Sequence, residues 1–388
     1  MPDIQIPESD IIRWRHHIHR HPELGYEEHQ TAGYIVEMLS TLEGVSIEQP
    51  TPTSVVATIT GTAGPGKTIA LRADIDALPV TEENDVEFCS VNAGVGHMCG
   101  HDTHAAMLMG AVHVLAPMRD RLHGSVKFIF QHAEERSPGG AYDLVDKGVL
   151  NGVDHCIGLH IMNGPVGQIG ILEDEVVTSA YDTAFIRISG KGSHSSMPHL
   201  SHDPVLIGAE MIVALHTIVS RNISPEHFAV VSPNVFHGGR AANVIPDTAE
   251  LAVNIRTRSE EDRKLIIERV KTLVTGIAQN NGASVEITWD EGPKGIAQDL
   301  ELVREIKALA VKTFGAQNVA SLRALTGSED FSAYNEVVPS CMFFTLGGGE
   351  SEYTNHHPKF LPQDASLATG TRMEVAIVLH LLGGDGHE

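Results

Sequence analysis

The first part of the chain, up to about residue 180, alternates helical and strand patterns. Residues 8–42 carry apolar side chains at helical spacing and predict a helix pair or one long helix, with a break at residues 21–25. Beyond them the pattern predicts strands 55–60 and 68–74, a helix over 103–115 with Asp102 as its N-cap, and strands 125–131 and 154–159. The run 68–74 is almost continuously apolar, which is typical of a strand buried on both faces of a sheet.

The pattern changes near residue 180. It then predicts, in order, strand 183–189, helix 204–221, strands 228–236 and 248–256, helix 260–280 and strand 284–289. The order βαββαβ is that of a ferredoxin-like domain, whose open sheet face and exposed edges favour dimerisation.

After residue 291 an α/β pattern returns, with helices 300–314 and 365–382 around strand 341–346. We therefore expect a two-domain α/β protein. A mainly parallel-sheet α/β domain is formed by residues 1–180 and 292–388, and a ferredoxin-like domain, residues 181–291, is inserted into it.

Composition narrows the classes of function. A chain of 388 residues with 42% hydrophobic side chains is long enough for two cores. The formal net charge of −23 would repel a phosphate backbone, so we expect no nucleic-acid partner. No membrane span or signal-like start is recognised, and four scattered cysteines fit a reducing compartment, so a cytoplasmic location is expected.

Potential metal ligands are concentrated in one short segment, Gly96-His-Met-Cys-Gly-His-Asp-Thr-His104. Thiolate and neutral imidazole are good ligands for zinc and its neighbours, and the glycines allow residues two apart to face one ion. Since the chain contains 23 histidines, a histidine-rich loop is the alternative. The histidines at 16, 17, 19 and 21 lie on a polar helical face with no converging acid, and we expect them to be surface or backbone-bonded residues.

The ends of the predicted strands favour the metal site over the loop. Four of them, 68–74, 125–131, 154–159 and 341–346, end in or are followed by side chains that can bind a metal ion or move a proton: Asp74 and Asp76, Glu134 and Glu135, His160, and His356. Active sites of open α/β sheets lie outside the carboxyl ends of the strands, so these groups are expected to meet in one crevice.

Eight motifs in order resemble those of the metal-dependent amidohydrolases that include aminoacylases, hippurate hydrolases and indoleacetyl-amino-acid hydrolases. The motifs span nearly the whole chain: HRHPELG (19–25), LRADIDALP (71–79), HMCGHDTH (97–104), QHAEE (131–135), GKGSH (190–194), NVIP (243–246), SEDF (328–331) and HHP (356–358). The resemblance implies hydrolysis of N-acyl-L-amino acids to a carboxylic acid and a free amino acid.

The resemblance also implies a two-metal centre in each subunit. Its ligands would be Cys99, His101, Glu135, His160 and His356, with Cys99 as the bridge. The thiolate favours zinc, although manganese, cobalt or nickel fit the same ligands. Glu134 matches the general base, which takes a proton from the attacking water and returns it to the leaving amine.

Two acids near residue 75 have different expected roles. Asp76 keeps the acid of a His-x-Asp motif of the wider superfamily and is expected to orient a ligand by a hydrogen bond. Asp74 stands where that motif has its histidine ligand, so it is either a catalytic group or a structural carboxylate paired with Arg72.

Residues 181–291 are expected to contribute to substrate binding and to assembly. By resemblance, His194 stabilises the oxyanion from the partner subunit of a homodimer or dimer of dimers, and Asn243 and Arg256 hold the substrate carboxylate. His357 is expected to be a neighbour of the ligand His356, and His97 and His104 to be supporting or structural groups.

Three other functions are alternatives to the hydrolysis of N-acyl amino acids. A cysteine hydrolase would use Cys99 as nucleophile and His101 as base, but it leaves the strand-end groups without a role. A binding protein could have kept the fold and lost the chemistry. A dipeptidase or carboxypeptidase of the wider superfamily is the third, but the ligands Cys99 and His101 favour the branch that acts on acyl amino acids.

Overall fold

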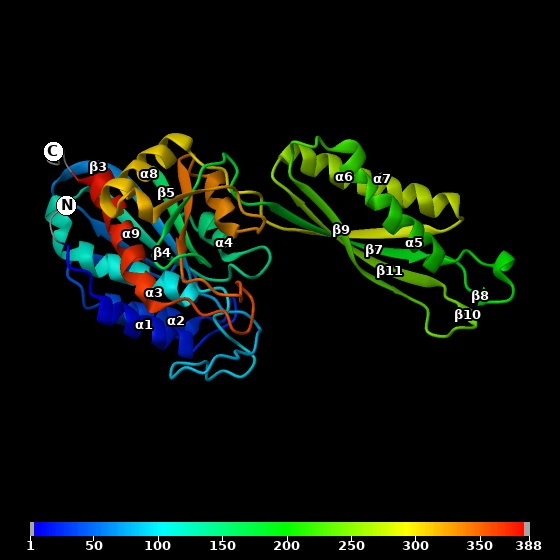
Figure 1. Cartoon of the computed structure of the whole chain (residues 1–388), viewed down its shortest axis with the longest axis horizontal. Helices are drawn as coiled ribbons and strands as arrows, with labels where there is room; N and C mark the ends of the chain where they lie inside the picture. Colours follow the sequence, from blue (N-terminus) through cyan, green and yellow to red (C-terminus); the bar gives the residue numbers. More distant parts are fainter. Residues whose placement is uncertain (1–3, 384–388) are drawn as a thin grey trace. The chain divides into compact units, whose positions relative to one another are not determined.

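The computed structural model describes residues 4–383 (Figure 1). The chain divides into two compact units. The first unit comprises Met1–Val177, Ile296–Ala324 and Asp330–Glu388, and the second unit comprises Thr178–Gly295 and Leu325–Glu329.

The first unit is built on an eight-stranded sheet with the order β1-β2-β4-β3-β5-β14-β6-β13. Its strands are β1 (Val45–Glu48), β2 (Val55–Thr60), β3 (Gly64–Asp74), β4 (His123–Gln131), β5 (His155–Met162), β6 (Ile169–Leu172), β13 (Val319–Leu322) and β14 (Cys341–Gly347). The central pairs β4–β3, β3–β5 and β5–β14 are parallel. The carboxyl ends of these four strands therefore lie at one edge of the sheet.

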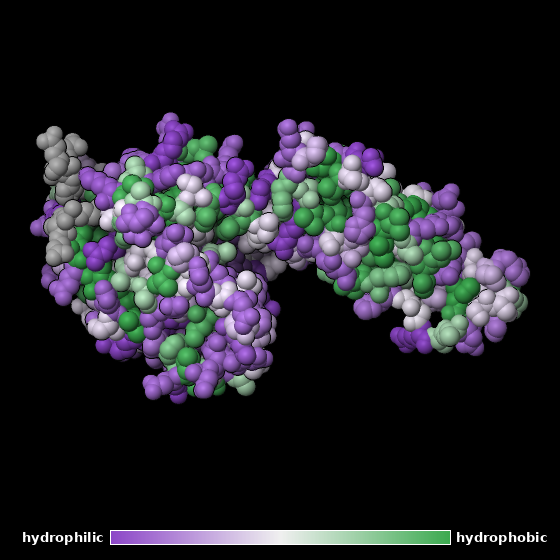
Figure 2. All heavy atoms as spheres, in the orientation of Figure 1, coloured by the Kyte–Doolittle hydropathy of each residue, from purple (hydrophilic) through white to green (hydrophobic). Residues whose placement is uncertain are grey.

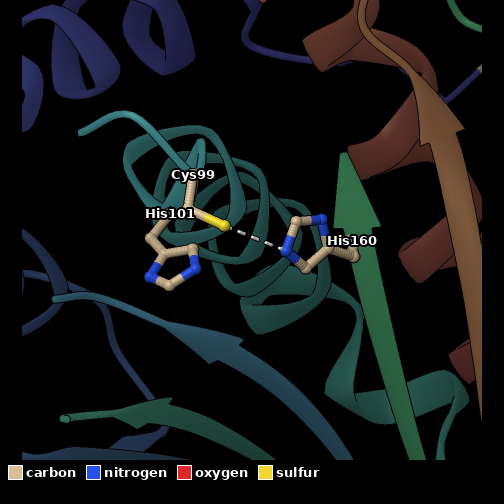
Figure 3. Close-up of side chains that lie close together, drawn as sticks. All are labelled: Cys99, His101 and His160. Atoms are coloured by element: carbon tan, nitrogen blue, oxygen red, sulfur yellow. Dashed lines mark hydrogen bonds between the residues drawn. The ribbon is translucent and has the colours of Figure 1, made fainter. Parts of the chain in front are cut away.

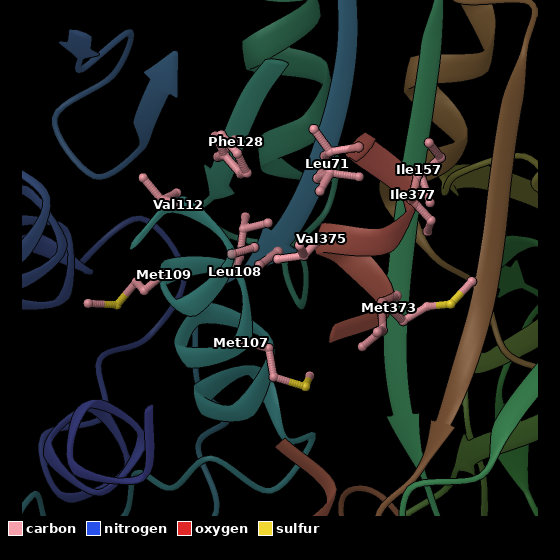
Figure 4. Packing of buried hydrophobic residues seen from close by; sticks show 14 of the residues in the cluster. Leu71, Met107, Leu108, Met109, Val112, Phe128, Ile157, Met373, Val375 and Ile377 are labelled. Carbon is pink, nitrogen blue, oxygen red and sulfur yellow. The ribbon is translucent and has the colours of Figure 1, made fainter. Parts of the chain in front are cut away.

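Helices pack around this sheet: α1 (Glu8–Arg20), α2 (His29–Leu39), α3 (His101–Leu115), α4 (Gly140–Asp146), α8 (Leu300–Phe314) and α9 (Leu367–Leu382). The N-terminal helix pattern is thus a pair, α1 and α2. All residues of α3 except His113 are buried, as expected for a helix that is apolar all round. Figure 4 shows side chains of α3, α9 and the strands, including Leu108, Ile377 and Phe128, in the same core.

Two expectations about the helices are wrong. Asp102 is not the N-cap of α3, because the helix begins at His101 after the left-handed Gly100. The Asp102 carboxylate is instead buried and accepts a hydrogen bond from Nε of Arg15 at 2.9 Å. His19 is not a surface residue: it is fully buried, with Nδ1 2.9 Å from Asp102 Oδ2 and Nε2 3.0 Å from Glu82 Oε1. The acids that surround it come from distant parts of the chain.

One helical stretch, Asp364–Leu382, is long and apolar enough to cross a membrane by length and composition alone, although the sequence pattern predicts a helix here and no membrane span. Within it, 67% of the apolar window is buried inside the fold. Met373, Val375 and Ile377 belong to the core cluster of the first unit. The stretch is therefore a core helix in this structure.

The second unit contains a four-stranded antiparallel sheet with the order β12-β7-β11-β9. Its elements are β7 (Ala180–Ser189), β8 (Ser193–His194), α5 (Pro204–Leu215), α6 (Thr217–Asn222), β9 (Ala229–Gly238), β10 (Val244–Ile245), β11 (Thr248–Thr257), α7 (Glu260–Asn280) and β12 (Ser284–Glu291). The helix expected over 204–221 is divided at His216. Asp203 and Ser259 cap α5 and α7 with their side chains, which explains where these helices begin.

The alternating burial of β7 and β11 places one apolar face of this sheet against the helices. The main strands and the two long helices follow the βαββαβ order. The predicted fold class is confirmed: the protein has a mixed, mainly parallel α/β sheet and a separate four-stranded antiparallel sheet.

Candidate metal centre

Cys99 and His101 lie on the two sides of Gly100, at the start of α3. Gly100 has a φ of +92°, and a Cβ there would lie 2.5 Å from Cγ2 of Ile161. Both the left-handed backbone and the contact with β5 therefore favour glycine. The turn brings the Cys99 sulfur to 3.5 Å from Nε2 of His160, which projects from β5 (Figure 3). Potential ligand atoms of Cys99, His101 and His160 all lie within 4.8 Å of one another.

A second group shares the same sulfur. Potential ligand atoms of Cys99, Glu135 and His356 also lie within 4.8 Å of one another, and Nε2 of His356 is 3.1 Å from Oε1 of Glu135. His356 has a φ of +72°, a strained conformation for a residue with a side chain. Its N–H donates to the carbonyl of Met98 at 2.7 Å, which ties the loop after β14 to the Cys99 segment.

Glu134 lies beside these groups. Its carboxylate forms a third group with His101 and Glu135 in which the ligand atoms lie within 4.8 Å of one another. The structure thus brings Glu134 together with all five predicted ligands at the carboxyl edge of the sheet.

Asp76 contacts two of the predicted ligands, as a group that orients them should. Its Oδ1 lies 3.1 Å from Nδ1 of His101, and its Oδ2 accepts the N–H of Glu135 at 2.9 Å. A proton on Nδ1 of His101 leaves Nε2 as the ligand atom. The same logic applies to His160, whose Nδ1 donates to the carbonyl of Ile161 at 2.8 Å.

The electrostatics of the cluster suit a cation. Burial, together with His104, lowers the pKa of His160 well below its ordinary value, so the ring is neutral, as a metal ligand must be. Burial opposes the charge on His101, but Asp74 and Cys99 raise its pKa well above the usual range. Hydrogen bonds with Cys99 and Glu135 raise the pKa of His356 to about 10. The positions of His101 and His356 therefore favour positive charge, whereas that of His160 does not.

The residues fit a transition-metal site. Nε2 of His101 is buried and has no hydrogen-bond partner among residues 4–383, and Oδ2 of Asp74 lies 3.6 Å from it, so the atom can still accept a ligand bond. One thiol, three imidazoles and a carboxylate form a donor set suited to zinc and its neighbours.

The sequence pattern left open the role of Asp74 and did not predict its pairing with His104. Nη1 of Arg72 donates to Asp74 Oδ2 at 2.6 Å, as in the structural alternative, but Nδ1 of His104 also lies 2.5 Å from Asp74 Oδ1. The other ring nitrogen of His104 accepts the N–H of Ile161 at 2.8 Å. The sequence did contain a signal for this pair. Asp74 ends a predicted strand, and His104 is three residues after the predicted ligand His101, so it lies on the same face of the helix.

The remaining histidines of these motifs lie outside the three groups. His357 is exposed and stacks on Tyr353, with ring centroids 4.5 Å apart. His97 is buried, and neither of its ring nitrogens has a hydrogen-bond partner within the described part of the chain.

The second unit carries the other three predicted site residues, and it places one of them apart from the other two. His194 on β8 is exposed, and the neighbouring Ser195 N–H donates to the carbonyl of Asn243 at 3.1 Å. Arg256 lies near the end of β11 that is farther along the chain from Asn243. Its Cζ is above the Tyr181 ring, 5.1 Å from the ring centroid. Residues 248 and 256 are separated by eight strand positions, roughly 26 Å at about 3.3 Å per residue. Within this unit, Asn243 and His194 are together and Arg256 is not with them.

Known proteins resemble the chain over nearly all of its length. A family model described as "Peptidase family M20/M25/M40" matches residues 70–380. An N-acyl-L-amino acid amidohydrolase of Geobacillus stearothermophilus is 43% identical over 286 residues, which are 73% of this chain and 76% of the relative. Thermostable carboxypeptidase 2 of Saccharolobus solfataricus is 36% identical over 375 residues, 95% of this chain and 94% of the relative.

A solved structure supports the same grouping. The crystal structure of the YXEP protein of Bacillus subtilis, described as a dinuclear metal binding peptidase from the M20 family, matches with a TM-score of 0.80 at 32% identity. The match covers 96% of this chain and 98% of that chain. The relatives reported above are named as an amidohydrolase and peptidases. With this fold, this cluster and these relatives, the chain belongs to the peptidase family M20/M25/M40.

Proposed function

We propose that the chain is a metal-dependent amidohydrolase that cleaves N-acyl-L-amino acids, with N-acetyl, N-benzoyl or similar acyl groups, to a carboxylic acid and a free amino acid. The observation that carries the proposal is the convergence of five potential metal ligands around Glu134 at one edge of the sheet. The relative named N-acyl-L-amino acid amidohydrolase supports the choice of substrate class.

Two divalent ions per subunit suit the two groups of donors that share the Cys99 sulfur. Cys99, His101 and His160 would hold one ion, and Cys99, Glu135 and His356 the other, with zinc favoured and manganese, cobalt or nickel also suited. When bound, such ions lower the pKa of water toward about 7 and polarise an amide carbonyl.

Glu134 is the proton carrier in this proposal. It takes a proton from the attacking water and returns it to the nitrogen of the departing amino acid. Asp76 supports this step through the ligands, because it fixes both the ring of His101 and the backbone of Glu135. The two adjacent glutamates thus have different roles: Glu135 is a metal ligand and Glu134 is the general base.

The substrate carboxylate requires positive charge in a protein with a net charge of −23. Arg256 is the proposed anchor, because its guanidinium is half-buried and only weakly hydrogen-bonded, at 3.2 Å to Asn254 and 3.3 Å to Ser328. His194 stabilises the oxyanion and Asn243 assists in binding. Since these two lie far from Arg256 in the second unit, we propose that they act on a substrate held by the partner subunit.

The second unit, residues 181–291 in the sequence pattern, is the proposed dimerisation domain. β9 is an edge strand, and Val230 and Val235 on it are exposed. Leu206 and Val213 are exposed on α5, where Figure 2 shows hydrophobic side chains gathered on the surface of this unit. An unpaired edge beside an apolar helix face suits a second copy of the same chain. We also propose a cytoplasmic location, in keeping with four free cysteines among the described residues.

A carboxypeptidase is the second candidate, because a relative that aligns with 95% of this chain at 36% identity is named Thermostable carboxypeptidase 2. Both reactions cleave an amide next to a free carboxylate, so the same ligands, base and anchor serve either. The difference lies in the group on the acyl side.

A substrate panel separates the two candidates. The purified protein is assayed with N-acetyl, N-benzoyl and N-indoleacetyl amino acids and with dipeptides and longer peptides, with the released amine as readout. Faster turnover of the simple acyl compounds supports the proposal, and faster turnover of peptides assigns the chain to the second candidate.

Glu134→Gln tests the base, and chelation tests the metal. The variant should keep its metal content and lose activity by on the order of 10²- to 10⁴-fold. Glu43→Gln is the matched control, since Glu43 is 94% exposed. Activity that survives rigorous metal removal would instead support a cysteine hydrolase.

A further inference from the structure

The backbone directly before the proposed base is held in an unfavourable conformation. Ala133 has a φ of +51°, in the left-handed region that residues with a Cβ rarely adopt. It follows the end of β4, and its backbone makes the turn that leads into Glu134 and Glu135. Such outliers persist only when their surroundings hold them in place.

A buried carboxylate holds this turn. The N–H of Ala133 donates to Oε1 of Glu28 at 2.7 Å, and both residues are fully buried. The carbonyl of Ala133 accepts the N–H of Gly140 at 3.0 Å. Both peptide groups of the strained residue are therefore fixed.

The segment before Glu28 packs on the same turn. A Cβ at Gly25 would lie 3.1 Å from Cα of Ala133 and 2.6 Å from Cγ of Arg136. Gly25 therefore permits a close approach that a larger residue would block, and it brings Glu28 within reach of the turn.

The carboxylate of Glu28 interacts with backbone groups at both ends of this contact: burial raises its pKa, and Glu28, Tyr26 and Ala133 each lower it through a backbone hydrogen bond. Glu28 occupies the N-cap position of α2, yet its side chain makes no capping hydrogen bond. It reaches instead to a residue 105 positions away in the sequence.

We propose that Glu28 is a positioning residue for Glu134. Glu28 and Asp76 accept the N–H groups of Ala133 and Glu135, the two residues that flank the base, at 2.7 and 2.9 Å. The two carboxylates thereby set the direction in which Glu134 leaves the backbone. This role rests on the proposed function of Glu134 as general base.

An uncharged acceptor can serve at this position. Burial and the nearby Asp76 raise the pKa of Glu28 to about 7. Glutamine, which keeps a carbonyl oxygen of the same reach, is therefore the conservative variant, and alanine removes the acceptor.

The test compares Glu28→Ala, Glu28→Gln and the double variant Glu28→Ala with Ala133→Gly, and Glu27→Ala serves as the exposed neighbour control. We expect Glu28→Ala to lower kcat by on the order of tenfold with KM and metal content unchanged. Glu28→Gln and Glu27→Ala should stay close to the parent. Glycine at 133 removes the strain, so the double variant should recover part of the lost kcat.

A parental kcat in Glu28→Ala, or a loss that Ala133→Gly does not reduce, would overturn the proposal. Amide hydrogen exchange of Ala133 in the parent protein gives a readout that needs no substrate and no variant. Slow exchange supports the held turn, and exchange as fast as an exposed loop overturns it. If the parent cleaves no compound in the panel, the proposed function fails, while the exchange measurement still tests the role of Glu28 in the turn.

Discussion

Asp74 and His104 form a buried pair, with Oδ1 of Asp74 at 2.5 Å from Nδ1 of His104. The second ring nitrogen of His104 accepts the N–H of Ile161 at 2.8 Å. The pair thus links the end of β3 and the first turn of α3 to the residue that follows the proposed ligand His160. Burial works against the charge of Asp74, but Arg72 and His101 hold the pKa of that carboxyl well below its usual range.

His104→Ala should therefore destabilise the first unit. The change leaves Oδ1 of Asp74 and the N–H of Ile161 without these buried partners, and we expect a loss of about 3 kcal/mol in the free energy of unfolding. Urea unfolding of the metal-free protein measures it. Arg187→Ala, which removes an exposed ion pair with Glu250 at 3.3 Å, should cost less than about 1 kcal/mol. Equal losses in the two variants would contradict the role of the buried pair.

Glu82 should make the stability depend on pH in acid. Burial opposes its charge, but the hydrogen bond and charge of His19 lower the pKa of Glu82 to about 2. A carboxyl with a depressed pKa contributes stability that is fully present above its unfolded pKa, about 4.3, and is lost as the pH falls through the folded pKa. The free energy of unfolding should therefore fall between about pH 4.5 and pH 2.

Glu82→Gln isolates this contribution. The variant should be less stable than the parent near neutral pH, and the difference should shrink as the pH approaches 2, where the parent carboxyl also loses its charge. Both proteins are unfolded in urea without metal, so that loss of metal at low pH does not enter, and the titration of the free ligands is common to both. A difference that stays constant with pH would show that the ion pair with His19 does not carry it.

The periodic elements of the fold could be predicted because they bury long apolar patterns. The strand pattern at 55–60 and the helix patterns at 260–280 and 300–314 have the bounds of β2, α7 and α8. The short strands β1, β6 and β13 were missed, since four residues carry too little periodicity to separate a strand from a loop.

The site could be predicted only as far as its residues follow strand ends. That pattern gathers Glu134, Glu135 and His160, and the structure brings them together. It says nothing of partners far away in the sequence, such as Glu28 with Ala133 or His19 with Asp102. His19 looks like a surface residue because a polar helix face is the same in sequence whether it meets water or buried acids.

Cys99→Ala should bind metal poorly at both positions, because the two groups of donors share its sulfur. Burial and Glu135 raise the pKa of the Cys99 thiol, so a bound cation is needed to stabilise the thiolate. Elemental analysis after dialysis should find less than one ion per chain, and most activity should be lost. Cys89→Ala is the control, since its thiol donates to the carbonyl of Asn84 outside the cluster. Two ions retained in Cys99→Ala would rule out a bridging sulfur.

His194 and the metal ligands should act across two subunits, and mixing of inactive variants can detect it. The reason is the geometry of the second unit, where β11 separates Arg256 from Asn243 and His194. In a dimer that pairs Cys99→Ala with His194→Ala, one site combines an intact metal cluster with an intact His194 from the other subunit. The second site lacks both.

Random association makes half of the dimers mixed, and each mixed dimer has one intact site of two, so the co-refolded pair should recover about a quarter of the parent activity. Each variant refolded alone should stay nearly inactive, and a mixture of the two without refolding sets the baseline. If His194 instead served the cluster of its own chain, neither site of the mixed dimer would be intact. Activity at the baseline after co-refolding, with mixed dimers verified by mass, would therefore place His194 in its own subunit's site or outside catalysis.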